Sequence, residues 1–85
     1  MKKVTQALNL APDILDGATM IHIYGNEFVL IENYRSILEY SNTCIKIRGR
    51  HVKLVICGTN LWIDRFTQDD CKVRGCITKM EYIPV

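Results

Sequence analysis

Turn-forming residues recur about every eight positions along most of this chain. They fall at Gly25-Asn26, Asn33, Ser41-Asn42, Gly49, Gly58-Thr59-Asn60, Gln68-Asp69-Asp70 and Gly75. The segments between them are short and rich in Ile, Val, Leu, Phe, Trp and Tyr, the residues that favour extended backbone. This spacing is typical of consecutive short strands joined by tight turns, so the sequence predicts an all-β domain.

The length and apolar content of the chain indicate one small folded domain. It has 85 residues, of which 48% are hydrophobic, enough for a modest core. No apolar run approaches the ~20 residues that a membrane-spanning helix needs. The first residues carry two lysines but no sustained apolar segment like that of a secretory signal. We therefore expect a cytoplasmic protein that is at most peripheral to a membrane.

The chain divides into an N-terminal arm at residues 1–17 and a single β domain at residues 18–85. Within the arm, Val4, Ala7, Leu8 and Ala11 recur at helical spacing. They predict a short helix to about residue 10, which Pro12 would end because the residue before a proline avoids helical backbone.

The β domain is predicted to contain about seven or eight short strands, because each interval between turns holds one. Neighbours in sequence should pair antiparallel as hairpins, giving a meander that curls into a sandwich or a barrel. A β-solenoid is the alternative. Gly75 lies inside the last strand and predicts a bulge or a sharp bend. Because so small a sheet has edges to hide, we expect the protein to form homo-oligomers.

The four cysteines lack the close pairs that zinc knuckles use. They are Cys44, Cys57, Cys71 and Cys76. Without an export signal, reduced thiols are favoured over a disulfide, and a disulfide over a metal site. If the hairpin at Gly49-Arg50 centres between those two residues, Cys44 faces Val55; a one-residue shift brings it opposite Cys57.

Residues with catalytic chemistry are present but do not form a recognisable constellation. His22 and His51 are the only histidines, and neither a nucleophile elbow nor a glycine-rich phosphate loop accompanies them. Asp69-Asp70 suits a plain turn better than a calcium loop. We therefore expect no enzymatic activity, no cofactor and no metal site.

A basic surface is predicted around one hairpin, from Lys46, Arg48, Arg50 and Lys53. Small β-barrels bind single-stranded nucleic acid with such charges and with exposed aromatics, here Tyr24, Tyr34, Tyr40 and Trp62. Charges that alternate with Ile and Val are also what any half-buried strand shows. Binding of single-stranded nucleic acid is the alternative function, and an anionic membrane or protein surface ranks above it as a partner.

One stretch of the sequence resembles a known family. Ile31-Glu32-Asn33-Tyr34-Arg35, followed by Ile37-Leu38-Glu39-Tyr40-Ser41, resembles the central signature I-E-N-H/Y-K/R-G-I-L-E-Y-S of the YabP/YqfC sporulation family. Spaced glycine and apolar positions extend the likeness from about Leu8 to Ile83, nearer the YqfC branch. Ser36 departs from the pattern, because the family prefers glycine there.

The resemblance implies a role that the residue chemistry does not supply. Members of the family are made in the mother cell of endospore-forming Firmicutes, are encoded beside membrane proteins, and have no known enzymatic activity. It implies a self-associating structural or adaptor module at the forespore envelope, with a sporulation membrane protein as partner. Its signature residues would then shape the fold: Ile31, Glu32, Asn33, Tyr34, Arg35, Leu38, Glu39 and Tyr40.

Overall fold

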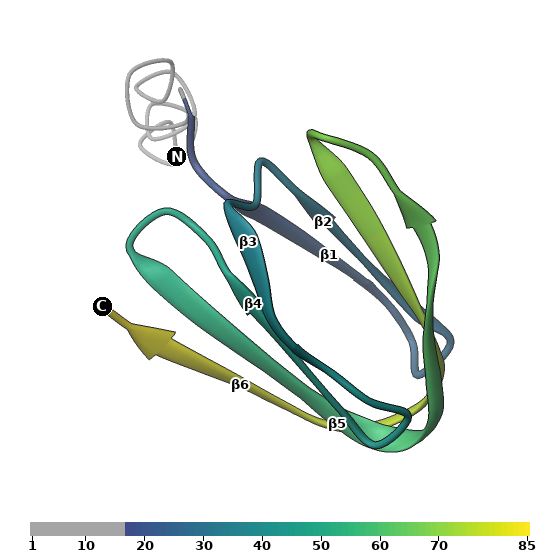
Figure 1. Cartoon of the computed structure of the whole chain (residues 1–85). Coiled ribbons are helices and arrows are strands. Elements are labelled where there is room, and N and C mark those ends of the chain that lie inside the picture. Colours follow the sequence, from purple (N-terminus) through teal and green to yellow (C-terminus); the bar gives the residue numbers. More distant parts are fainter. Residues whose placement is uncertain (1–16) are drawn as a thin grey trace, which may run out of the picture.

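The computed structural model describes residues 17–85, and within them the chain is all-β and antiparallel, as predicted (Figure 1). The strands are β1 (Met20–Tyr24), β2 (Phe28–Glu32), β3 (Ser36–Tyr40), β4 (Cys44–Arg48), β5 (Val52–Phe66) and β6 (Asp70–Pro84). They form one open sheet in the order β1-β2-β6-β5-β4-β3. The predicted helix of the N-terminal arm lies outside the described residues.

The predicted number of strands is too high, and the reason lies in β5 and β6. The described residues form six strands, because β5 and β6 each run for 15 residues through positions interpreted as interruptions. Gly58-Thr59-Asn60 is a bulged stretch inside β5, where the pairing with β6 shifts register. Closure of the sheet into a sandwich or barrel is not confirmed. All the strand pairs are antiparallel, which argues against the alternative of a β-solenoid.

Sequence neighbours pair as hairpins with one exception, between β2 and β3. The corner at residues 33–35 carries the chain away from β2. One side of β2 pairs with β1, and its other side pairs with β6. β3 joins the sheet at its other end, beside β4. The two terminal strands of the sheet are therefore β1 and β3.

The long β5–β6 hairpin bends, so that the sheet folds back over itself (Figure 1). One part, here called the β2 half, contains β1, β2, residues 70–74 of β6 and residues 62–66 of β5. The other, the β4 half, contains β3, β4, residues 52–57 of β5 and residues 79–84 of β6. The bend is the reason why one sheet supplies two facing layers.

Glycine makes this bend possible at two places. Gly75 has a φ of 126°, and a Cβ built on it would lie 2.5 Å from the backbone oxygen of Asn60. A Cβ on Gly58 would similarly strike the carbonyl of Cys76. The bulge or bend predicted at Gly75 is confirmed, because the pairing with β5 shifts register opposite this residue, and the two strands approach there at a separation that only glycine allows.

Neighbouring turns satisfy backbone groups that the bulges release. The Gly58 amide donates to the Thr43 carbonyl at 3.1 Å, and the Leu61 amide donates to the Asn42 carbonyl at 2.9 Å. The β3–β4 turn therefore replaces the ladder partners that β5 lacks at the bend, and fewer polar groups stay unbonded there.

The hydrophobic core lies between the two halves. Its buried members alternate along their strands, as expected for sheet faces that point inward. They are Val29, Ile31, Ile45, Ile47, Leu54, Ile56, Leu61, Cys71 and Val73. Burial, and then the nearby Asp70 charge, raise the pKa of the Cys71 thiol to about 11, so this thiol is protonated at neutral pH.

The structure adopts the second of the two hairpin registers, in which Cys44 pairs with Cys57. The Gly49 amide donates to the Val52 carbonyl, which makes Cys44 and Cys57 a non-hydrogen-bonded pair in the alternating ladder. Such pairs have Cα atoms about 4.5 Å apart, inside the range that a disulfide can span.

This register predicts an intramolecular Cys44–Cys57 crosslink when the protein is treated with diamide. In a Cys71→Ala/Cys76→Ala background, the mass should fall by about 2 Da, the two thiol hydrogens lost on oxidation. Trypsin should then release residues 36–46 joined to residues 54–65, detectable by mass spectrometry. If Cys44 instead faced Val55, oxidation would yield dimers and no internal link.

Because β5 and β6 approach closely at Gly75, we expect Gly75→Ala to lower the free energy of unfolding far more than the same change at another glycine with a positive φ. Gly25 has a φ of 59°, and nothing lies within 4 Å of a Cβ built there. We expect Gly25→Ala to lower the free energy of unfolding by about 1 kcal/mol and Gly75→Ala by about 3 kcal/mol or more. Urea titration measures both losses; equal losses would show that the backbones of β5 and β6 do not approach closely at Gly75.

Candidate functional site

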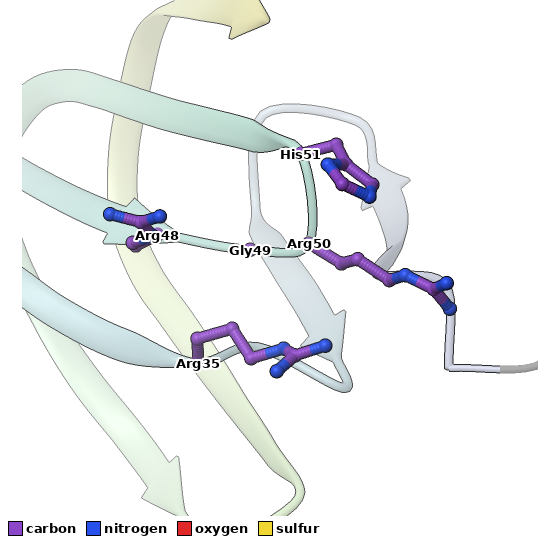
Figure 2. Close-up of a pocket in the computed structure, with 5 residues that line it drawn as sticks. All are labelled: Arg35, Arg48, Gly49, Arg50 and His51. Carbon is purple, nitrogen blue, oxygen red and sulfur yellow. The ribbon is translucent and has the colours of Figure 1, made fainter. Parts of the chain in front are cut away.

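A hollow of about 340 Å³ lies at the β4–β5 turn and is lined mainly by basic residues. Arg35, Arg48, Gly49, Arg50 and His51 line it. In the view of Figure 2 the side chains of Arg35 and Arg50 extend to the same side of the turn, while Arg48 lies at the end of β4. We call this site the basic hollow.

Backbone pairing positions Arg35 beside the turn. The Arg35 amide donates to the Arg48 carbonyl at 2.8 Å, just before β3 pairs with β4. The preceding corner depends on Asn33, which has a φ of 62°, a left-handed conformation that asparagine tolerates. Its side-chain amide donates to the Ala18 carbonyl at 3.0 Å, and its backbone amide to Asp69 at 2.7 Å.

Thr19 joins this corner to the β4–β5 turn. Its hydroxyl donates to the Asn33 carbonyl at 2.9 Å and accepts from the Arg50 amide at 2.8 Å. Gly49 is buried under the same side chain, since a Cβ there would lie 2.6 Å from the Thr19 hydroxyl. The wall of the basic hollow is therefore built on fixed backbone from three separate segments.

Ion pairing leaves positive charge concentrated at this end of the β4 half. Four ion pairs join described side chains: His22–Glu32, Lys46–Glu39, Arg65–Asp70 and Arg74–Asp64. Within residues 17–85, none of these pairs includes Arg35, Arg48 or Lys53. Arg48 moreover lies directly opposite Lys53 across the strand pair, an arrangement that repels.

The four residues of the predicted basic surface therefore differ in their surroundings in the structure. Lys46 forms an ion pair with Glu39 at 3.2 Å, and that contact raises the pKa of the lysine. Arg35, assigned only to the family signature, instead joins Arg48 and Arg50 at the basic hollow. The pairing of β3 with β4 sets Ser36 opposite Arg48. A correct prediction of this pairing from the sequence would have placed the backbone of Arg35 beside the β4–β5 turn.

The remaining signature residues have identifiable places in the fold. Ile31 is in the core, and Glu32 contacts the His22 ring nitrogen at 3.2 Å. Tyr34 donates its hydroxyl to the Thr67 carbonyl at 2.6 Å. Leu38 is exposed on β3.

Tyr40 lies at a second hollow, between β3 and the end of β5. Its hydroxyl accepts a hydrogen bond from the Ile63 amide at 3.2 Å. Ile37, Tyr40, Ile63 and Phe66 line this apolar groove of about 370 Å³. Side chains thus bridge β3 to β5 where backbone pairing between the two strands is absent from the described residues.

The two terminal strands differ in how their outer edges are protected. β3 has a register shift between Ile37 and Glu39, and Tyr40 bridges it to β5. β1 pairs in regular register with β2 and has the sequence Met-Ile-His-Ile-Tyr, without proline, lysine or carboxylate. Among residues 17–85, no strand pairs with its outer side. Natural sheets usually protect such edges with charges, proline or bulges.

The aromatic residues considered for base stacking lie in two separate places. Tyr24 stacks on Phe28 with ring centroids 4.3 Å apart, and Trp62 lies opposite Arg74 on the same β2 half. Tyr34 and Tyr40 lie instead beside the end of β5. The predicted basic hairpin belongs to the β4 half, so Tyr24 and Trp62 lie apart from it, whereas Tyr40, at the end of β3, is on the same half.

Residues 17–85 offer neither a cluster of metal ligands nor a membrane-spanning helix. No group of three or more His, Cys, Asp and Glu side chains in residues 17–85 is arranged to hold a metal ion. The same residues include no helix with the length and apolarity needed to cross a membrane.

Comparison with known proteins agrees with the resemblance in the sequence. The YabP family pattern matches residues 16–85. The uncharacterized protein YqfC of Bacillus subtilis (strain 168) is 25% identical over 80 residues, which cover 94% of this chain and 86% of YqfC. No solved structure matches the chain. Since the family pattern covers most of the sequence, the chain belongs to the YabP family.

Proposed function

We propose that this protein is a non-enzymatic sporulation protein that associates with itself through β1. It would act in the mother cell as a structural adaptor at the forespore envelope, together with a membrane-protein partner. Membership of the YabP/YqfC family, which is associated with sporulation, supports the biological setting. The unprotected edge of β1 supports the mode of action.

A second copy of the chain is the occupant that suits β1 best. Two copies of one strand can pair antiparallel about a two-fold axis, which extends both sheets. β1 carries no lysine, arginine or carboxylate, so pairing two copies of it does not place permanently charged side chains of the same sign opposite each other. Ile23, which is 53% exposed, would be covered by the added strand.

Light scattering on the reduced, full-length protein across a range of concentrations tests the proposal. We expect a defined oligomer, or a mass that grows with concentration. Ile23→Lys should shift the protein to monomer, because lysine on an edge strand opposes strand addition. Leu38→Lys is the matched control: Leu38 is 51% exposed on β3, the opposite terminal strand, and its replacement should leave the mass unchanged.

Circular dichroism of each variant verifies that the sheet is still folded. A monomeric wild-type protein at every concentration would refute association through β1. Equal loss of association in the two lysine variants would show that another surface joins the copies.

The proposed location predicts where a fluorescent fusion should collect. In sporulating cells the fusion should surround the forespore on its mother-cell side, and co-expression of the membrane partner should be required for that pattern. Even fluorescence throughout the mother cell, with the partner present, would contradict the adaptor role. It would leave self-association through β1 unaffected.

A further inference from the structure

We infer that Cys44 and Cys57 form a site of reversible oxidation, at which a small-molecule disulfide converts the two thiols into an internal disulfide. The product ties β4 to β5 beside the bend and stabilises the folded sheet. This inference is independent of association through β1, because it depends on other strands and needs only one copy of the chain. Diamide forces oxidation of thiols that meet, whereas exchange at equilibrium closes the internal bond only where it is more stable than the mixed disulfide.

The two side chains lie next to each other on the outer face of the β4 half. Cys44 is directly opposite Cys57, and the next pair along the strands, Ile45 and Ile56, is buried in the core. Since successive side chains alternate between faces, the two thiols point outward together. Both residues are half-buried, so a small molecule can reach the sulfur atoms from solvent.

The two thiols also interact directly. Burial and the Glu39 carboxylate raise the pKa of the Cys44 thiol, and the charge and a side-chain hydrogen bond of Cys57 raise it further. A hydrogen bond between the two side chains requires their sulfur atoms to be neighbours. The attacking and the resolving sulfur of a thiol–disulfide exchange therefore start close together, which favours the second step of that reaction.

Hydrogen bonds hold the backbone on both sides of the pair. The Ser41 hydroxyl accepts from the Cys44 amide at 3.0 Å, and the Ser41 amide donates to the Cys44 carbonyl at 2.9 Å. The Thr78 hydroxyl donates to the Cys57 carbonyl at 3.3 Å. The Cα separation of such a cross-strand pair, about 4.5 Å, lies within the range of disulfides, so the bond can form without movement of the strands.

The other two cysteines are not placed for the same chemistry. Cys71 lies in the core, where burial raises its pKa to about 11 and keeps the thiol protonated. Cys76 is exposed and lies opposite Thr59, within the bend. Because β5 lies between the strands of Cys76 and Cys44, their Cα atoms are at least about 9.5 Å apart, beyond the reach of a disulfide.

The exchange balances in two steps. One protein thiol loses its proton to solvent and attacks a sulfur of the small disulfide, which forms a mixed disulfide and releases one small thiolate. The second protein thiol, also deprotonated, attacks the protein sulfur of the mixed disulfide and releases the other small thiolate. The two leaving thiolates take up the two protons. Two protein thiols are thereby oxidised to one disulfide, while the small disulfide is reduced to two thiols.

The new bond lies next to hydrogen bonds that support the bend. Gly58 follows Cys57 directly, and its amide donates to the carbonyl of Thr43, the residue before Cys44. The disulfide therefore holds the β3–β4 turn against the bulge of β5. Because it also closes a short loop in the unfolded chain, unfolding becomes less favourable.

Glutathione and its disulfide, at millimolar concentration and defined ratio, are the probes for the full-length protein. Samples are quenched with acid, alkylated in denaturant and weighed by mass spectrometry, which separates thiols, mixed disulfides and the internal disulfide. The Cys76→Ala protein should form the internal disulfide in at least about tenfold excess over the mixed disulfide, because the second step is intramolecular. Dithiothreitol should restore both thiols.

Cys57→Ala is the matched control, because it also leaves two thiols within reach of glutathione, those of Cys44 and Cys76. We expect this variant to collect mixed disulfides and no internal one. In urea titrations, oxidation of Cys76→Ala should lower the equilibrium constant for unfolding about a hundredfold, the effect expected for closing a loop of this length. The same treatment of Cys57→Ala should give no such gain.

Each outcome decides the inference. An internal disulfide that only Cys76→Ala forms, that dithiothreitol reverses and that raises the resistance to urea supports it. Thiols that react with glutathione disulfide only in urea, or equal amounts of mixed disulfide in the two variants, would overturn it. An internal disulfide without a gain in resistance to urea would do the same, because the bond would then not stabilise the bend.

Discussion

The close approach of the paired strands β5 and β6 at two glycines is the constraint on which the rest of this structure depends. Gly75 passes within a distance of Asn60 that excludes a side chain, and Gly58 does the same beside Cys76. A straight hairpin of this length would leave one apolar face of the sheet uncovered. The bend instead turns β2 and β4 toward each other, which encloses the core between them. In so small a chain this is the way one sheet can bury both of its parts.

Once the sheet has folded, polar joints hold its open ends together. Thr19 and Asn33 connect the start of β1, the β2–β3 corner and the β4–β5 turn. Tyr34 and Tyr40 connect the β3 side to the far end of β5. Several residues of the family signature therefore act as joints between the halves, since Asn33, Tyr34 and Tyr40 each bond a segment distant in sequence. Arg35 differs from them, because its side chain is directed to the basic hollow.

The sequence predicted what depends on local patterns and missed what depends on distant pairing. The regular spacing of turn residues and short apolar segments predicted the all-β class correctly. Gly58-Thr59-Asn60 looked like a turn because Asn60, with a φ of 53°, has the same left-handed backbone in a bulge as in a turn. Whether the chain reverses there is decided by Gly75 and β6, which lie far along the sequence.

Distant strand pairing also explains why only part of the basic hollow could be predicted from the sequence. The basic hairpin was visible, but its register depended on His51 adopting a φ of 62°, which no simple turn rule required. That register places Lys53 opposite Arg48, and the pairing of β3 brings Arg35 beside them. Lys46, next in the alternating pattern, is instead neutralised by Glu39 from the neighbouring strand. The charges in the sequence thus located the basic hairpin, while the pairing of the strands determines which of its basic side chains lie beside a carboxylate.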